Sequence, residues 1–176
     1  IDAGVSLPVH AAPAFRFRRL FELQKAKSPT KIIFLLPISV AESLSILKAF
    51  NSLFKDSCDQ VRSTMFVRFH PELQRTALER YEPQVRNFEL NETQLGAYQL
   101  LPYAKVIVSA VSSACVEAVA LGIPLIIIRS ASGRPNNPVD ADTFCTGIQT
   151  LESASDLTAA LVRHLEENKS AQRVGS

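Results

Sequence analysis

Residues 105–128 read KVIVSAVSSACVEAVALGIPLIII, and this stretch decides the fold. Its β-branched start at residues 105–109 favours a strand, and a polar turn then leads into a predicted helix over residues 114–121, which Gly122 ends. A second apolar run at residues 125–128 predicts another strand. A strand, a helix and a further strand in this order are typical of a parallel sheet.

The same alternation extends outward from this stretch over the chain from Lys31. The apolar runs lack polar alternation, which is typical of strands buried on both faces, and apolar residues recur at helical spacing between them. We therefore expect an α/β fold: a doubly wound, mostly parallel, Rossmann-like sheet with helices on both faces. The predicted strands are residues 32–36, 65–69, 87–90, 105–109, 125–128 and 147–150; the predicted helices are about four turns opened by a Ser39–Glu42 capping box, residues 72–81, 94–101 and 114–121, and a last helix capped by Ser153 or Ser155.

Composition excludes several protein classes. The chain has 176 residues, 47% hydrophobic and 20% charged, which suits one globular domain, and no apolar run approaches the ~20 residues of a membrane span. The cysteines Cys58, Cys115 and Cys145 show no CxxC or zinc-ligand spacing, so we expect reduced thiols in a cytoplasmic protein without a metal. No basic stripe interleaved with aromatics is present, which argues against a nucleic-acid partner.

The predicted boundaries are a basic leader at residues 1–30, the sheet domain at residues 31–166 and a flexible tail at residues 167–176. Residues 1–31 hold six Lys or Arg and two Asp or Glu, and they show neither an initiator Met nor a secretory signal. We expect this leader to be a linker from a missing N-terminal domain. It is either a solvated connection or a contact to phosphate or to the inner face of an anionic membrane.

The common catalytic motifs GxGxxG, GxxxxGK[ST], HExxH and GxSxG are absent, which disfavours a dinucleotide dehydrogenase, an ordinary NTPase, a zinc protease and a serine hydrolase. The remaining polar candidates follow strands. Ser112 and Ser113 lie where a buried strand turns into a helix, so their hydroxyls and the first helix N–H groups form a candidate phosphate site. The alternative is that one serine simply caps the helix.

Two further residues belong to this candidate site. His70 ends the second predicted strand and would share the edge with the serines, where an imidazole can donate to phosphate or protonate a leaving phosphate. The alternative is a structural histidine. Glu117 lies one helical turn after Ser113, where its carboxylate would accept hydrogen bonds from ribose hydroxyls. Its alternative is a solvent-facing carboxylate near the helix N-terminus.

Three segments together resemble a known family: residues 68–71 (RFHP), 109–118 (SAVSSACVEA) and 121–126 (LGIPLI). They are similar to the C-terminal half of GT-B-fold glycosyltransferases, and more closely to bacterial surface-carbohydrate enzymes. These include capsule sialyl- and Kdo-type transferases and the glycerophosphotransferases of teichoic acid synthesis. The resemblance extends over residues 31–165 and rests on a His-Pro dipeptide and a Ser-Ser turn, which in those families hold the phosphate of a nucleotide-activated substrate.

The resemblance implies a set of binding residues. His70, Ser112 and Ser113 would bind phosphate, and Glu117 would contact the nucleoside or another part of the activated substrate. Arg68 stands where those families commonly have Lys, which keeps the charge and changes the geometry. Ser39 belongs to residues 36–39, which together with Glu42 match the turn of those families that faces the substrate across the cleft. Asn137 stands in an Asn-Pro pair of a later loop that would also contact the substrate.

The expected function is the binding of a nucleotide-activated sugar or alditol phosphate within a glycosyltransferase of cell-surface polysaccharide synthesis. CMP- or CDP-linked substrates are favoured and UDP-linked ones are an alternative, and no cofactor or metal is expected. The chain alone would bind the substrate without turnover, because the acidic catalytic base of these enzymes belongs to the other half, and His70 is a candidate leaving-group stabiliser. The alternatives are a sugar-nucleotide epimerase domain and a non-catalytic module that docks partners in a glycan assembly complex.

Overall fold

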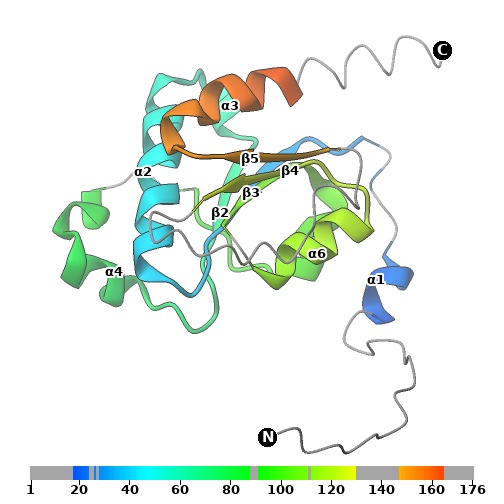
Figure 1. Ribbon diagram of the computed structural model, residues 1–176, viewed down its shortest axis with the longest axis horizontal. Coiled ribbons are helices and arrows are strands. Elements are labelled where there is room, and N and C mark those ends of the chain that lie inside the picture. Colours follow the sequence, from blue (N-terminus) through cyan, green and yellow to red (C-terminus); the bar gives the residue numbers. More distant parts are fainter. Residues whose placement is uncertain are drawn as a thin grey trace, which may run out of the picture.

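The structure, a computed structural model, describes residues 18–23, 26, 28–87, 91–110, 112–129 and 147–164. Its centre is a five-stranded sheet in the order β2-β1-β3-β4-β5, and every pairing is parallel. This confirms the expected Rossmann-like α/β fold (Figure 1). The strands are β1 Lys31–Leu35, β2 Met65–Arg68, β3 Ala104–Ser109, β4 Leu125–Ile128 and β5 Ile148–Leu151; the helices are α1 Arg18–Glu22, α2 Val40–Asp56, α3 Asp59–Arg62, α4 Arg75–Tyr81, α5 Ala97–Leu100 and α6 Ser113–Ala120, with 3₁₀ turns η2 Pro83–Asn87, η3 Leu101–Tyr103 and η4 Ala154–Asp156 and a last helix over residues 157–164.

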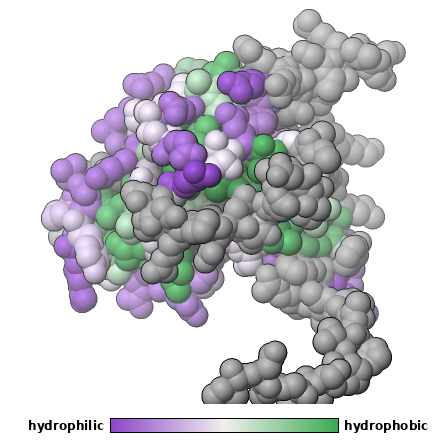
Figure 2. Space-filling view, in the orientation of Figure 1, coloured by the Kyte–Doolittle hydropathy of each residue, from purple (hydrophilic) through white to green (hydrophobic). Residues whose placement is uncertain are grey.

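Helices cover both faces of the sheet, as expected. One core cluster joins α2 and residues 157–161 to one face, and a second cluster joins α1, α5 and α6 to the other face. Figure 1 shows α2 and the orange helix on one side of the sheet and α6 with α1 on the other. Figure 2 shows that hydrophilic side chains predominate over the outer side formed by α2 and α4.

The strand β1 shows why the apolar runs are continuous. Ile32 and Phe34 belong to the cluster on the α2 side, whereas Ile33 and Leu35 belong to the cluster on the α6 side. Successive side chains of a strand point to opposite faces, so a strand covered on both faces needs an apolar residue at every position. The period-two alternation of a half-exposed strand is therefore missing from this sequence.

The strand predicted near residues 87–90 falls almost entirely outside the described residues. Asn87 is the last residue of the 3₁₀ turn η2, and residues 88–90 lie outside the described residues. Residues 91–93 pair with β2 at Val67. The Val67 amide donates to the Asn91 carbonyl at 2.9 Å, and the Thr93 amide donates to the Val67 carbonyl at 2.9 Å. Among residues 91–93 the pairing with β2 is a single parallel bridge between Val67 and Glu92.

Two helices differ from their predicted bounds. The helix predicted over residues 72–81 begins at Arg75, because the chain first turns at His70, whose carbonyl accepts the Leu73 amide at 2.9 Å. The helix predicted over residues 94–101 is the short α5 followed by η3. Both differences follow from local turns at helix starts, where sequence patterns define boundaries poorly.

Part of the predicted leader contacts the sheet domain. Leu20 of α1 is 4% exposed and packs in the cluster on the α6 side, and the Ala26 amide donates to the Pro102 carbonyl at 2.9 Å. Residues 1–17 lie outside the described residues. Among the described residues, no helix combines the length and the apolar character that crossing a membrane requires.

Candidate functional site

A cavity lies at the point where the order in which the chain adds strands to the sheet changes direction. From β1 the chain moves to β2 on one side, and it then returns to β3 on the other side. Helices α2 and α6, which follow β1 and β3, therefore lie on opposite faces of the sheet. The carboxyl ends of β1 and β3 lie between these two helices. Open parallel sheets bind ligands at such a switch point.

The cavity at this switch point has a volume of about 360 Å³. This volume lies within the range of about 300–1,000 Å³ that is typical of small-molecule sites. Its walls come from the ends of β1 and β2, the start of α2, the start of α5 and the start of α6. The lining residues are Leu35, Leu36, Pro37, Ile38, Glu42, Arg68, Phe69, His70, Pro71, Gly96, Ala97, Ser112, Ser113 and Ala114.

Ser112 stands at the N-cap position of α6, but its side chain makes no capping hydrogen bond. Its Oγ lies 3.5 Å from the Oγ of Ser109 and 3.7 Å from the Sγ of Cys115. The Ser109 hydroxyl is itself fixed, since it donates to the Leu35 carbonyl at 2.8 Å. The alternative that one serine caps the helix is thus confirmed in position, since Ser112 is the N-cap residue, but its hydroxyl makes no capping hydrogen bond to the helix.

The first turn of α6 supplies further hydrogen-bond donors. The opening N–H groups of an α-helix have no partner within the helix, and here the first amide with a helical partner is that of Cys115, which donates to the Ser112 carbonyl at 3.1 Å. Ser113 is exposed and, like Ala114, lines the cavity. The positive end of the α6 dipole therefore faces the cavity from the same side as the two serine hydroxyls.

His70 lines the cavity, and one of its two ring nitrogens already has a hydrogen-bond partner. Its Nδ1 accepts a hydrogen bond from the Glu72 amide at 3.2 Å. In the neutral imidazole this fixes the proton on Nε2 and makes Nε2 a hydrogen-bond donor. A single turn after β2 thus both positions the ring and selects its tautomer.

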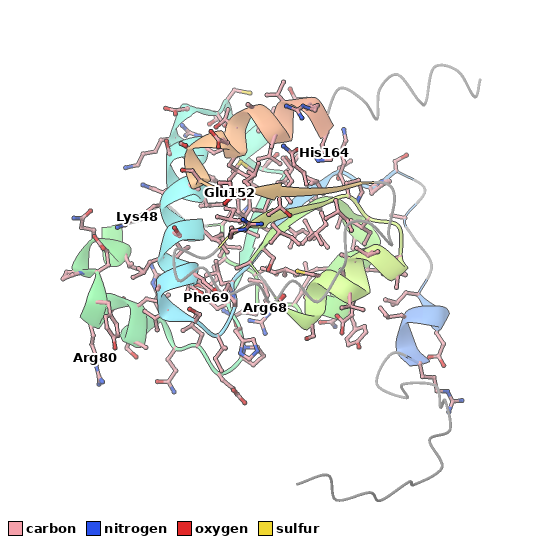
Figure 3. The ribbon with its side chains drawn as sticks, in the orientation of Figure 1. Lys48, Arg68, Phe69, Arg80, Glu152 and His164 are labelled. Carbon is pink, nitrogen blue, oxygen red and sulfur yellow. The ribbon has the colours of Figure 1, made fainter. Side chains whose placement is uncertain are left out.

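Arg68 is the last residue of β2 and lies opposite Leu35 of β1 in the parallel register. Its side chain is half-buried, lines the cavity and makes no ion pair within 4.0 Å in the described part of the chain. Figure 3 shows Arg68 and Phe69 between α2 and α6. A guanidinium without a carboxylate partner, next to a cavity, is suited to an anionic ligand.

Two other expected residues lie elsewhere. Glu117 does not line the cavity: it is 9% exposed, and its Oε1 accepts a hydrogen bond from the Tyr98 hydroxyl at 3.2 Å. This burial contradicts the alternative of a solvent-facing carboxylate. Ser39 caps α2 by accepting from the Glu42 amide at 3.5 Å, so it borders the cavity through its neighbours rather than lining it. Asn137 lies outside the described residues.

Two parts of the wall differ in what the sequence indicated. Pro37 and Ile38 line the cavity and belong to the turn that the resemblance places opposite the substrate. Gly96 was not expected in the site: it is the N-cap residue of α5, and its amide donates to the Gln99 side chain at 2.8 Å. Glu42 carried a signal, but the Ser39-x-x-Glu42 spacing indicated a capping box. In the structure Glu42 lines the cavity, and only the resemblance pointed to that position.

Cys115 lies directly behind Ser112. Its thiol is fully buried and donates to the Ala110 carbonyl at 3.2 Å. Burial raises the pKa of this thiol, and hydrogen bonds with Ser112 and Ser109 offset only part of the effect. Because the thiolate is the nucleophilic form, this cysteine supports the serine turn and is not a reactive group at neutral pH.

The arrangement can hold an anion with several oxygen atoms. Arg68, His70 Nε2, the two serine hydroxyls and the first amides of α6 all offer hydrogen-bond donors to one cavity. Among the described residues, no group of three or more His, Cys, Asp or Glu could hold a metal ion. Comparison of the chain with protein-family models and with curated proteins gave no match to either.

Proposed function

We propose that this chain binds a nucleotide-activated sugar or alditol phosphate and forms the substrate-binding half of a GT-B-type glycosyltransferase of cell-surface polysaccharide synthesis. The observation that supports the proposal is the convergence of Arg68, His70, Ser112 and Ser113 on one cavity at the switch point of the sheet. The resemblance of residues 68–71 and 109–126 to those enzymes concerns the same residues.

Phosphate is the chemical group that best suits these side chains. Arginine is permanently charged and pairs with phosphate through two parallel hydrogen bonds, and serine hydroxyls and helix amides add neutral donors. A phosphate at the start of α6 also meets the positive end of the helix dipole. The remaining wall, formed by Leu36, Pro37 and Ile38, is apolar and suits the faces of a base or sugar.

In the intact enzyme these residues would act on the leaving group. As the sugar is transferred, negative charge develops on the departing nucleoside phosphate, and preorganised donors stabilise that charge. His70 Nε2, Arg68 and the serine turn would supply these donors. A second domain would close over the cavity, exclude water and provide the catalytic base. This role would place the protein in the cytoplasm, where the basic leader could contact the inner face of the membrane.

Calorimetric titration of the 176-residue chain with CMP, CDP, UDP and GDP tests the proposal. We expect binding to at least one nucleotide, with cytidine nucleotides favoured, and weak affinity because half of the binding cleft belongs to another domain. Arg68→Ala and His70→Ala should each weaken the best ligand at least about tenfold, since both remove a hydrogen bond to a charged group.

Arg80→Ala is the matched control. Arg80 is an exposed arginine of α4, and Figure 3 shows it on the outer side of the molecule, away from Arg68. This variant removes the same charge without touching the cavity, so its affinity should equal that of the unchanged protein. Absence of binding to all four nucleotides at millimolar concentration would contradict the proposal and favour a module that docks partner proteins or polymer.

A further inference from the structure

Glu42 is the only carboxylate among the residues that line the described cavity. It lies in the first turn of α2, where a capping-box glutamate would turn back to the amide of the N-cap residue. Only the serine half of that motif forms here: Ser39 Oγ accepts from the Glu42 amide at 3.5 Å. Glu42 lines the cavity and is half-buried.

The carboxylate has no partner in the described part of the chain. None of the ion pairs among the described residues includes Glu42, and none of their hydrogen bonds involves its side chain. Arg68 lines the same cavity and is also unpaired, so these two opposite charges do not neutralise each other across it within 4.0 Å. The cavity therefore presents a cationic, donor-rich wall at β2 and α6 and one anionic acceptor at α2.

Such a bipolar cavity does not suit a ligand that is phosphate throughout. An ionised carboxylate only accepts hydrogen bonds, and it repels a second anion. It is a good partner for hydroxyl groups and for the exocyclic amine of a base. The apolar residues Pro37 and Ile38, which precede Glu42 in the chain, give this side of the cavity the surface that a sugar or base ring requires.

We propose that Glu42 determines specificity in this cavity by accepting hydrogen bonds from O–H or N–H groups at the nucleoside end of the ligand, while Arg68 and the serine turn hold the phosphate. This inference rests on the function proposed above and extends it. Arg68 and the serine turn would bind any phosphate group. Glu42 would favour those phosphate ligands that also carry an O–H or N–H donor at their nucleoside end.

The test compares Glu42→Gln with the unchanged chain for two ligands, CMP and inorganic pyrophosphate. The variant keeps the size of the side chain and removes its charge. CMP should bind about tenfold more weakly or worse, because a hydrogen bond to a charged acceptor is lost. Pyrophosphate should bind equally well or more tightly, because a repulsive charge is gone. The ratio of the two affinities is the readout, and loss of folding would lower both together.

Two further variants separate contact from general electrostatics. Glu72→Gln removes the same charge from an exposed side chain that lies two residues from His70 and does not line the cavity, so both affinities should stay unchanged. Glu42→Asp keeps the charge but draws the carboxylate back by one methylene group. It should weaken CMP without any gain for pyrophosphate.

Analogues of CMP show which group of the nucleotide donates the hydrogen bond to Glu42. If Glu42 accepts from the base amine, the Glu42→Gln penalty disappears for UMP, which lacks that amine; if it accepts from ribose, the penalty disappears for 2′,3′-dideoxy-CMP. Equal Glu42→Gln effects on CMP and pyrophosphate overturn the inference alone. Failure of the unchanged chain to bind any nucleotide overturns the proposed function and this inference with it.

Discussion

The hydroxyl oxygens of Ser109 and Ser112 lie 3.5 Å apart at the end of β3 and the start of α6. Ser109 is fully buried and donates to the Leu35 carbonyl of the neighbouring strand, so the end of the sheet holds it in place. Ser112 is the N-cap residue of α6 and yet makes no side-chain cap. The serine that would ordinarily stabilise the helix is thus oriented by the sheet and left for a ligand.

Ser112→Ala should therefore change stability little. We expect the free energy of unfolding to fall by no more than about 0.5 kcal/mol, because the Ser112 hydroxyl has no helix cap to lose and its contacts with Ser109 and Cys115 are long, at 3.5 and 3.7 Å. Ser39→Ala is the comparison, because Ser39 does cap α2 through the Glu42 amide, and the loss of a cap costs about 1 kcal/mol. Urea denaturation of both variants measures the difference. Equal losses of about 1 kcal/mol would show that Ser112 caps α6 after all.

Ser113→Ala should separate phosphate binding from nucleoside binding. The hydroxyl of Ser113 lies at the exposed start of α6, where only a phosphate is expected to meet the helix end. The affinity for a nucleoside diphosphate should fall several-fold, about 1 kcal/mol for a lost hydrogen bond, while the affinity for the bare nucleoside stays the same. Calorimetry with CDP and cytidine provides both values. Equal losses for the two ligands would refute the placement of phosphate at α6.

The sequence was sufficient for the elements that are buried on both faces. The apolar runs at residues 32–35 of β1, 106–108 of β3 and 125–128 of β4 lack polar alternation, which is the pattern of strands buried on both faces. The third predicted strand, near residues 87–90, stays a prediction, because residues 88–90 lie outside the described residues. The described chain ends η2 at Asn87 and next pairs with β2 through a bridge at Glu92.

The sequence predicted those site residues that directly follow strands. It did not predict the environment of residues whose surroundings depend on how a neighbouring helix packs. His70, Ser112 and Ser113 line the cavity because the carboxyl ends of parallel strands share an edge, which the strand order alone implies. Glu117 was expected beside the ligand, but α5 packs against α6 and Tyr98 takes up its carboxylate. The position of α5 depends on tertiary packing, which no spacing in the sequence encodes.

The buried thiol of Cys115 should make stability depend on pH in alkaline solution. Burial raises the folded-state pKa of this thiol above the unfolded value of about 8.5. The folded state then holds the proton when the unfolded state has released it, so the stabilising contribution is complete below pH ~8.5 and is lost as the pH rises through the folded pKa.

The measurement is the free energy of unfolding in urea across this pH range. The unchanged protein should lose stability with rising pH more steeply than Cys115→Ala, by up to about 1.4 kcal/mol per pH unit. Cys58→Ala is the control, because Cys58 is exposed at the surface, and it should keep the slope of the unchanged protein. Identical slopes for all three proteins would show that the Cys115 thiol titrates alike in the folded and unfolded states.

The two core clusters should contribute independently to stability. Leu47 and Ile127 are both almost completely buried, Leu47 in the cluster on the α2 side and Ile127 in the cluster on the α6 side. Truncation of either residue to alanine should cost about 2–5 kcal/mol, because the lost contacts leave a cavity in close-packed surroundings. The sheet separates the two sites, so the double variant should lose the sum of the single losses, within about 0.5 kcal/mol. Chemical denaturation of the three variants measures these values, and a marked departure from additivity would mean that the two clusters share one cavity or relax together.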